Sequence, residues 1–306
     1  MRIRYMDLQH LQKTPTRIAA CIGYFDGVHK GHQELIRQTI AMAEEHHCGS
    51  AMITFDPDPV SITRPGSEVH HISTLRQKIN LAVNAGIENI FILKFSYEMS
   101  RLSPREFEDK VLGSFDLCGL VCGFDFHYGY RGEGNADTLR DHCGYEVRIV
   151  DPIVDHGEKI SSTRIVKLLE EGDVEEAERL LGYPYEVDGI VKKGHGKGNE
   201  IGFPTANLHI PSEYVYPHPG VYAGYALIQD KRYRAMINLG HNPTFNYSPE
   251  LSLEVHLLDF NGDLYDKRMR LQFKVFVREE KKFNSVGNLK LQLEQDRYAI
   301  RRMLKS

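Results

Sequence analysis

Short apolar runs alternate with amphipathic segments over the first half of the chain. The runs have the length of buried strands, and the segments between them space their apolar residues as helices do. We expect strands at 18–23, 50–55, 89–95, 119–124 and 146–150, and helices at 31–46, 75–85, 104–115 and 136–142. This alternation predicts an α/β, Rossmann-like domain with a parallel sheet and helices on both faces. Two short helices, 161–171 and 173–181, follow.

From about residue 186 the pattern changes to strands without intervening helices. We expect strands at 186–191, 220–228, 232–239, 251–258 and 269–277, separated by Gly, Pro and Asn turns. Only residues 285–304 have helical spacing. The second half is therefore predicted to be an antiparallel β-barrel, or a sandwich, with a C-terminal helix. We place the boundary near residue 185, which gives domains 1–185 and 186–306.

Composition narrows the function class. The chain has 306 residues, enough for two cores, and its net charge of -4 without a Lys/Arg-rich run argues against nucleic-acid binding. No apolar stretch is long enough for a membrane span or a signal core, so we expect a cytoplasmic protein. The five cysteines are odd in number and lie in apolar or helical segments of the first half, which favours reduced packing residues.

The segment from Gly23 to His32 holds the strongest chemical signal, because it joins a buried strand to a helix. A helix start presents free N–H groups and a positive dipole end, and glycines allow an anion to approach the backbone. His29 and His32, three residues apart, would lie together there and donate hydrogen bonds to phosphoryl oxygens, which suits nucleotidyl transfer. Zinc ligation is the alternative, but no partner motif for zinc appears. Ordinary helix-start residues are the other alternative.

A second candidate anion site opens the helix predicted at 161–171. Ser161, Ser162 and Thr163 supply hydroxyls, and Arg164 can grip a phosphate through two parallel hydrogen bonds. Alternatively, Ser161 or Ser162 only caps the helix and Arg164 is solvated. The presence of the first motif favours the functional interpretation.

Together, the motifs G-x-F-D-G-V-H-x-G-H and I-S-S-T-R resemble the adenylyltransferase half of prokaryotic bifunctional riboflavin kinase/FMN adenylyltransferases, the FAD synthetases. The resemblance extends through Phe55-Asp56-Pro57, Gly123-Phe124-Asp125-Phe126 and the C-terminal half. Tyr24 stands where this family usually has Asn, and Asp58 where F-D-P-H-P is usual.

The resemblance implies roles for residues of the first half. His29 and His32 should contact the ATP phosphates, and residues 161–164 should hold the leaving pyrophosphate, with Arg164 counted as catalytic. Asp125 should lie near the adenosine, and Asp56 and Pro57 should contact flavin. The remaining implied ATP contacts are Gly23, Phe25, Asp26 and Gly31.

The second half carries a glycine-rich loop that leads into no predicted helix. It contains Gly194, Gly196, Lys197 and Gly198, which the resemblance makes ATP contacts. Thr205 and Asn207, two apart on an extended segment, would point the same way and could ligate Mg²⁺ bound by nucleotide phosphates. The alternative is that both satisfy nearby backbone groups in a turn.

By resemblance, G-F-P-T-A-N is the riboflavin-kinase signature. Glu254 would then be the general base, and Gly220, Val221 and Tyr222 would contact flavin. Its own sequence context alone favours the alternative that Glu254 is an outward-facing strand carboxylate. Asn199 replaces an Arg usual in the family, which puts kinase strength in question.

We therefore expect a bifunctional enzyme that phosphorylates riboflavin to FMN in the second domain and adenylylates FMN to FAD in the first. Each step would use ATP and Mg²⁺. One alternative is a monofunctional FMN adenylyltransferase whose barrel is a flavin-binding or regulatory module. Another is a binding protein without turnover. The oligomeric state is left open.

Overall fold

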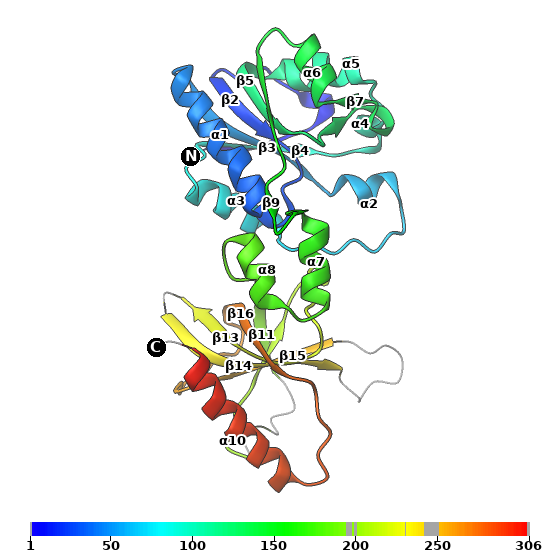
Figure 1. The fold of residues 1–306 in the computed structure, drawn as a ribbon. Coiled ribbons are helices and arrows are strands. Elements are labelled where there is room, and N and C mark those ends of the chain that lie inside the picture. Colours follow the sequence, from blue (N-terminus) through cyan, green and yellow to red (C-terminus); the bar gives the residue numbers. More distant parts are fainter. Residues whose placement is uncertain (1, 194–197, 199–200, 230, 242–250, 305–306) are drawn as a thin grey trace. The chain divides into compact units, whose positions relative to one another are not determined.

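The computed structural model describes residues 2–193, 198, 201–229, 231–241 and 251–304 (Figure 1). The chain divides into two compact units, Met1–Ser162 and Thr163–Ser306. The predicted domain boundary lies near residue 185, so residues between 163 and 185 contact the second unit more than the first.

The first unit is built on a six-stranded parallel sheet in the order β1-β4-β3-β2-β5-β8. The strands are β1 (Arg2–Met6), β2 (Arg17–Ile22), β3 (Gly49–Asp56), β4 (Asn89–Lys94), β5 (Asp116–Gly123) and β8 (Glu146–Val150). All five predicted strands are present. The edge strand β1 was not predicted, because its side chains are largely exposed and form no apolar run.

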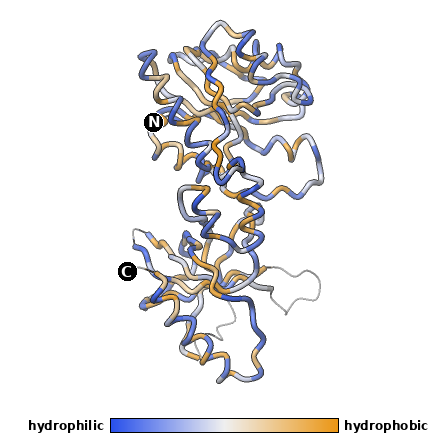
Figure 2. The backbone as a smooth tube through the Cα atoms, viewed as in Figure 1, coloured by the Kyte–Doolittle hydropathy of each residue, from blue (hydrophilic) through white to orange (hydrophobic). Residues whose placement is uncertain are grey.

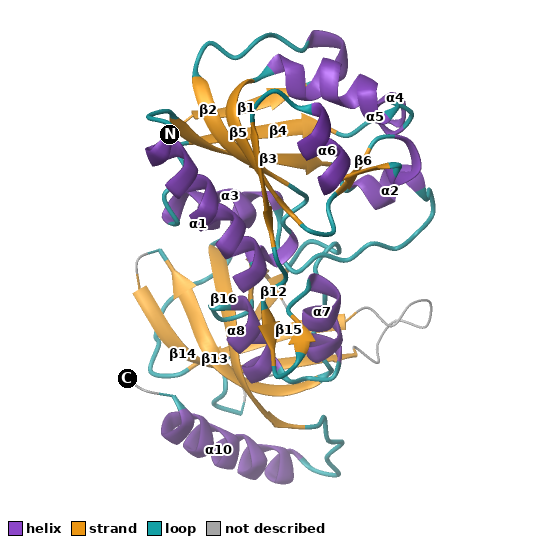
Figure 3. Ribbon diagram, turned by 45° about the horizontal axis from the view of Figure 1, so that its top comes forward, coloured by secondary structure: helices purple, strands orange, loops and turns teal. Residues whose placement is uncertain are grey.

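Helices cover both faces of this sheet, as predicted (Figure 3). They are α1 (Lys30–Glu45), α2 (Pro59–Thr63), α3 (Leu75–Asn84), α4 (Tyr97–Ser100), α5 (Pro104–Glu106) and α6 (Ala136–His142). Alternate residues of β2 enter two separate cores. Ala19 and Cys21 pack with α1 and α3, whereas Ile18, Ala20 and Ile22 pack with α6 and the segment after α5. That division follows from the two-residue period of a strand.

The helix predicted at 104–115 is a composite. After α5 the chain continues as a π-helix, η3 (Phe107–Val111), and a 3₁₀ turn, η4 (Leu112–Ser114). Other short elements are η1 (Leu8–His10), η2 (Asp26–Val28), η5 (Tyr130–Gly132), β6 (His127–Tyr128), β7 (Gly134–Asn135), β9 (Val154–Asp155) and β10 (Glu158–Lys159).

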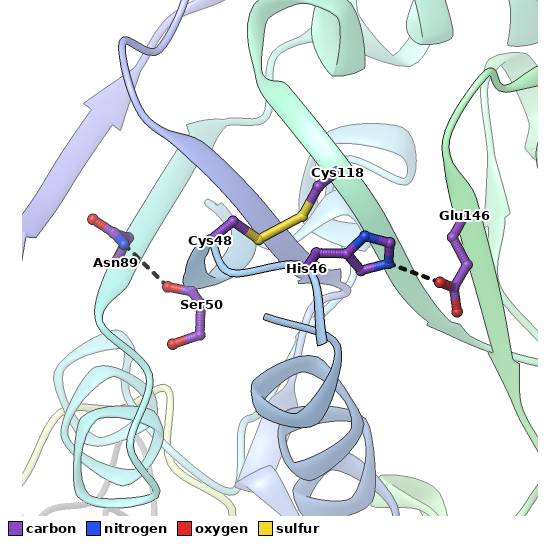
Figure 4. Close-up of a disulfide and its surroundings, with 6 residues drawn as sticks. All are labelled: His46, Cys48, Ser50, Asn89, Cys118 and Glu146. Atoms are coloured by element: carbon purple, nitrogen blue, oxygen red, sulfur yellow. Dashed lines mark hydrogen bonds and ion pairs between the residues drawn. A yellow bond between two sulfur atoms is a disulfide. The ribbon is translucent and has the colours of Figure 1, made fainter. Parts of the chain in front are cut away.

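Side chains from different elements contact one another at the amino ends of the parallel strands, the edge of the sheet opposite the loop of residues 23–32 (Figure 4). His46 Nε2 lies 2.9 Å from a Glu146 carboxylate oxygen. Cys48 and Cys118 form a disulfide there, so the expectation of reduced thiols is wrong for this pair. The other cysteines, Cys21, Cys122 and Cys143, are free.

The second unit begins with α7 (Ser162–Glu170) and α8 (Val174–Leu181) and continues into a closed antiparallel barrel in the order β11-β12-β15-β14-β13-β16. Its strands are β11 (Glu186–Lys192), β12 (Ala206–His209), β13 (Gly220–Ile228), β14 (Lys231–His241), β15 (Leu251–Leu257) and β16 (Arg268–Arg278), followed by α10 (Val286–Met303). This confirms the predicted barrel with a C-terminal helix. The short strand β12 was not predicted.

Apolar residues concentrate in the strands of each unit (Figure 2). On one side of the barrel, Val221, Ala223 and Met236 pack against Ile300 and Leu304 at the end of the chain. Among the described residues, no helix combines the length and hydropathy that crossing a membrane requires.

Candidate active sites

The loop between β2 and α1 starts at Gly23, whose N–H donates to the carbonyl of Ile53 (3.1 Å). Two residues that carry side chains then adopt left-handed backbone, Phe25 at φ 59° and Val28 at φ 36°. Such conformations cost free energy, and they cluster at ligand-binding sites. Phe25 and Val28 are themselves buried in the core beside α1, which holds the loop in this shape.

His29 and His32 are stacked at the start of α1, with ring centroids 3.7 Å apart and an interplanar angle of 18°. The N–H of His32 donates to Nδ1 of His29 (3.4 Å), which leaves the proton of a neutral His29 on Nε2. A Cβ on Gly31 would lie 3.1 Å from the His29 ring. The absence of a side chain at Gly31 therefore keeps this face of the ring uncrowded.

Both imidazoles are held neutral. Burial, followed by the positive charge of Lys159, lowers the pKa of His29 to about 4. Burial also lowers the pKa of His32 well below its ordinary value, and the neighbouring His29 adds to this effect. Nδ1 of His32 is buried without a hydrogen-bond partner in the described part of the protein. A neutral imidazole can still donate a hydrogen bond from its protonated nitrogen, so the predicted contacts of both rings with phosphate need no positive charge.

Asp26 has a structural role in the loop. Its carboxylate accepts from the N–H groups of Ile72 (3.1 Å) and Ser73 (3.2 Å), and it is nearly buried. Its backbone carbonyl accepts a hydrogen bond from the Ser162 hydroxyl (3.0 Å). The structure thereby joins the two candidate anion motifs, which lie 136 residues apart in the sequence. Ser161, the first serine of the second motif, is the residue before Ser162 in the chain.

Thr163 and Arg164 continue α7 in the second unit. Arg164 lies 3.7 Å from Glu176 of α8, with 14% of its side chain exposed. Its predicted phosphate contact stays a prediction. On the first unit, Asp125 forms an ion pair with Lys159, and both charges influence His29. Lys159 was not predicted as a site residue, because a lysine in a loop gives no sequence signal.

Asp56 is the last residue of β3, and a cis peptide bond joins it to Pro57. They lie at the same carboxyl edge of the sheet as residues 23–32, here called the histidine loop, because β2 and β3 are parallel neighbours. Their predicted flavin contacts therefore fall at an edge where polar loops converge.

In the barrel, strand register brings the predicted catalytic residues together. Asn207 of β12 stands directly opposite Glu254 of β15, and Asn238 of β14 stands opposite Glu254 on the other side. Directly paired residues project from the same face of a sheet. The three polar side chains thus form one row, in which Asn238 was not predicted.

Residues 202–207, which carry the kinase signature, are held close to this row of polar side chains. Nδ1 of His256, two residues beyond Glu254, lies 2.9 Å from the Pro204 carbonyl, and burial lowers the pKa of His256. A neutral His256 therefore donates to that carbonyl. A Cβ on Gly198 would lie 2.3 Å from the Phe203 carbonyl oxygen and 3.3 Å from Oγ1 of Thr205. Only glycine fits at position 198, next to Phe203 and Thr205.

Of the other residues predicted as barrel site residues, some lie in β13 and some lie outside the described residues. Val221 and Tyr222 are buried in β13, and the Tyr222 hydroxyl donates to the His218 carbonyl. Gly220 starts the same strand against Phe276. Their flavin contacts stay predictions. Gly194, Gly196, Lys197 and the departure at Asn199 lie outside the described residues.

Comparison with known proteins connects both sites to one family. Residues 11–164 match the family model described as FAD synthetase, and residues 181–304 match that described as riboflavin kinase. Bifunctional riboflavin kinase/FMN adenylyltransferases from Listeria monocytogenes and Bacillus subtilis are 38% and 36% identical to the chain. The first comparison covers 90% of this chain and 88% of the relative, and the second covers 94% and 92%.

Among solved structures, one described as a macrolide-efflux protein from Streptococcus pneumoniae matches with a TM-score of 0.91 and 33% identity, over 98% of both chains. The family resemblance seen in the motifs is confirmed by matches that extend through both units. The chain therefore belongs to the family of bifunctional riboflavin kinase/FMN adenylyltransferases.

Proposed function

We propose that this protein makes FAD from riboflavin in two ATP-dependent steps. The second unit phosphorylates riboflavin to FMN, and the first adenylylates FMN to FAD and releases pyrophosphate. The observation that carries this proposal is that separate family models, one for each activity, match the two halves of the chain. This disfavours the alternative of a barrel without catalysis. We retain residue 185 as the proposed domain boundary.

In the first unit, a phosphate oxygen of FMN attacks the α-phosphorus of ATP. Negative charge builds on the phosphoryl oxygens as pyrophosphate leaves. Nε2–H of His29, the free N–H groups at the start of α1, and His32 are positioned to stabilise that charge. The buried Nδ1 of His32 gains a partner when ligand binds. Ser161, Ser162, Thr163 and Arg164 are proposed to hold pyrophosphate, and Asp125 to lie near the adenosine. Gly23, Phe25 and Asp26 shape the loop.

In the second unit, Glu254 is proposed to take the proton from the ribityl 5'-hydroxyl as that oxygen attacks the γ-phosphorus and ADP leaves. Thr205 and Asn207 are proposed to hold Mg²⁺, which would neutralise phosphate charge. Their neutral oxygens suit a hard cation already carried by a nucleotide.

The test uses the purified protein with ATP and Mg²⁺, supplied with riboflavin in one reaction and FMN in another, and separates the products by chromatography. FAD from both substrates is expected. FAD from FMN alone would restrict catalysis to the first unit, and no conversion from either substrate would contradict the proposal. Chelation with EDTA is expected to stop both steps.

ATP, riboflavin and FMN are the proposed substrates, and we propose the cytoplasm, where ATP is abundant, as the site of action. The net charge of -4 gives no electrostatic basis for nucleic-acid or membrane partners.

A further inference from the structure

Tyr24 and Asp58, which lie in the loops after β2 and β3, converge on one imidazole. The hydroxyl of Tyr24 lies 3.4 Å from Nδ1 and 3.3 Å from Nε2 of His71. A carboxylate oxygen of Asp58 lies 3.7 Å from Nδ1 of the same ring. The His71 ring is 16% exposed and the Asp58 side chain 9%. Tyr24, Asp58 and His71 therefore form one largely buried polar cluster, here called the clasp.

Lys78 contacts both the ring and the backbone of Tyr24 in the clasp. This lysine is 2% exposed, yet neither candidate reaction uses it. Its ammonium lies 3.3 Å from the centroid of the Tyr24 ring and 3.2 Å from the Tyr24 carbonyl oxygen. The Thr54 hydroxyl donates to the same carbonyl (3.1 Å). A desolvated ammonium over the face of an aromatic ring is attracted to it, so these contacts hold the tyrosine ring in one orientation.

The clasp connects the ends of a segment that leaves the sheet after β3 and returns at α3 (Figure 1). Asp58 lies at its start, where its carboxylate also caps α2 by accepting from Val60 N–H (2.5 Å). His71 lies at its end, next to the residues bound by the Asp26 carboxylate. Residues 63–68 between them are exposed. The segment is thus pinned at its base and open at its middle.

The position of the clasp indicates which substrate it serves, provided that the proposed function holds. In the sheet, β2 lies between β3 and β5. Asp125, proposed to lie near the adenosine, follows β5, whereas the clasp lies on the β3 side. Asp58 directly follows Asp56 and Pro57, which are proposed to contact flavin. The clasp therefore lies beside the proposed FMN site, on the β3 side of the loop.

We propose that Tyr24, Asp58 and His71 clasp segment 57–73 against the histidine loop and thereby set the affinity for FMN in adenylyl transfer. Tyr24 and His71 are positioning residues in this proposal. They act by ordering the segment and take no part in the chemistry at phosphorus.

The test compares Tyr24→Phe, which removes only the hydroxyl, with Tyr5→Phe, a matched change at a tyrosine that is 70% exposed on the edge strand. Loss of one buried hydrogen bond is expected to raise the KM for FMN about fivefold. The kcat, the KM for ATP in adenylyl transfer and riboflavin phosphorylation are expected to change less than twofold. Amide hydrogen exchange of residues 59–71 should accelerate in Tyr24→Phe and not in Tyr5→Phe.

His71→Asn examines the clasp from the other side. It should produce the same KM and exchange changes, and the double variant with Tyr24→Phe should add little to either single change. Unchanged exchange and unchanged KM in Tyr24→Phe or in His71→Asn would overturn the proposal, as would a loss confined to kcat. If the wild-type protein made no FAD from FMN, the proposed function would fail, and the exchange data would still decide whether the clasp orders the segment.

Discussion

At the scale of residues, the histidine loop combines backbone strain, burial and an unsatisfied nitrogen within a few positions. Each is unfavourable in the free protein, because left-handed Val28, neutralised imidazoles and the unpartnered Nδ1 of His32 all cost free energy. The ATP phosphate proposed to bind here would offset the last of these costs by giving that nitrogen a partner. On this proposal, the loop is organised for its ligand before the ligand binds.

Replacing His32 with Ala should separate the two activities. Removal of an oriented donor at a phosphoryl site costs about 10²–10³ in kcat, so FAD formation from FMN should fall by that factor while riboflavin phosphorylation persists. Glu254→Ala should do the reverse, because it removes only the proposed base of the kinase step. Initial rates with each flavin measure both effects. Loss of both activities from either change would contradict separate sites.

The neutral histidines also predict an acid-sensitive first unit. The folded-state pKa of His29 is about 4, below its ordinary value of 6.5, so the unfolded chain binds more protons between these values. The contribution of His29 to stability is complete above pH 6.5 and is lost as the pH falls towards 4, by about 2–3 kcal/mol. Urea unfolding of the wild-type protein and of His29→Gln across this pH range measures this contribution. If the free energies of unfolding of the two proteins changed with pH in parallel, the prediction would be wrong.

At the scale of elements, α10 is attached to the barrel by a polar contact as well as by its apolar face. Arg278 of β16 donates to both carboxylate oxygens of Asp296, which is 3% exposed, with a shortest distance of 2.7 Å. Such a pair contributes little net stability when intact, but removing one partner leaves a buried charge without compensation.

Asp296→Asn should therefore destabilise the second unit by about 3 kcal/mol. Glu294→Gln is the control, because this residue lies on the same helix in an ion pair with Arg297 and is 42% exposed. Denaturant unfolding compares the two, and FAD formation from FMN should survive in both. A control variant as unstable as Asp296→Asn would show that the effect does not depend on burial.

Sequence patterns predicted most elements because their apolar periods are long and regular, as in β3 or α1. They missed β1, whose exposed side chains form no apolar run, and β12, which has four residues within a Gly- and Pro-rich segment. Motif reasoning proposed the two histidines, and the family resemblance proposed Glu254; their roles stay predictions. Lys78 escaped it, because a lysine within an amphipathic helix looks solvated until the fold buries it against Tyr24.

At the scale of the whole molecule, each unit has its own core, and the helices between the two family matches belong to the second. Ile165, Leu169 and Leu180 of α7 and α8 are fully buried, and the Leu169 carbonyl accepts from the N–H of His218 (2.9 Å). Residues 165–180 lie outside both family matches. They nevertheless supply apolar surface that the barrel unit buries.

A fragment comprising residues 163–306 should therefore phosphorylate riboflavin and unfold at a higher temperature than one comprising 186–306. Burying a single Leu or Ile side chain is worth about 1.5–3 kcal/mol, and the shorter fragment loses several. Calorimetry and kinase assays of both fragments provide the measurement. Equal melting temperatures would place the two helices with the first unit instead.

The hydrogen bond from Ser162 to the Asp26 carbonyl has a consequence for synthesis on the ribosome. Every strand of the parallel sheet is complete once residue 150 has been translated, so the nascent chain can form the sheet and stack its two imidazoles by then. The hydroxyl cluster arrives only with residues 161–163. A polypeptide arrested between these points would carry the stacked imidazoles but would lack the Ser162 hydroxyl that bonds to their loop.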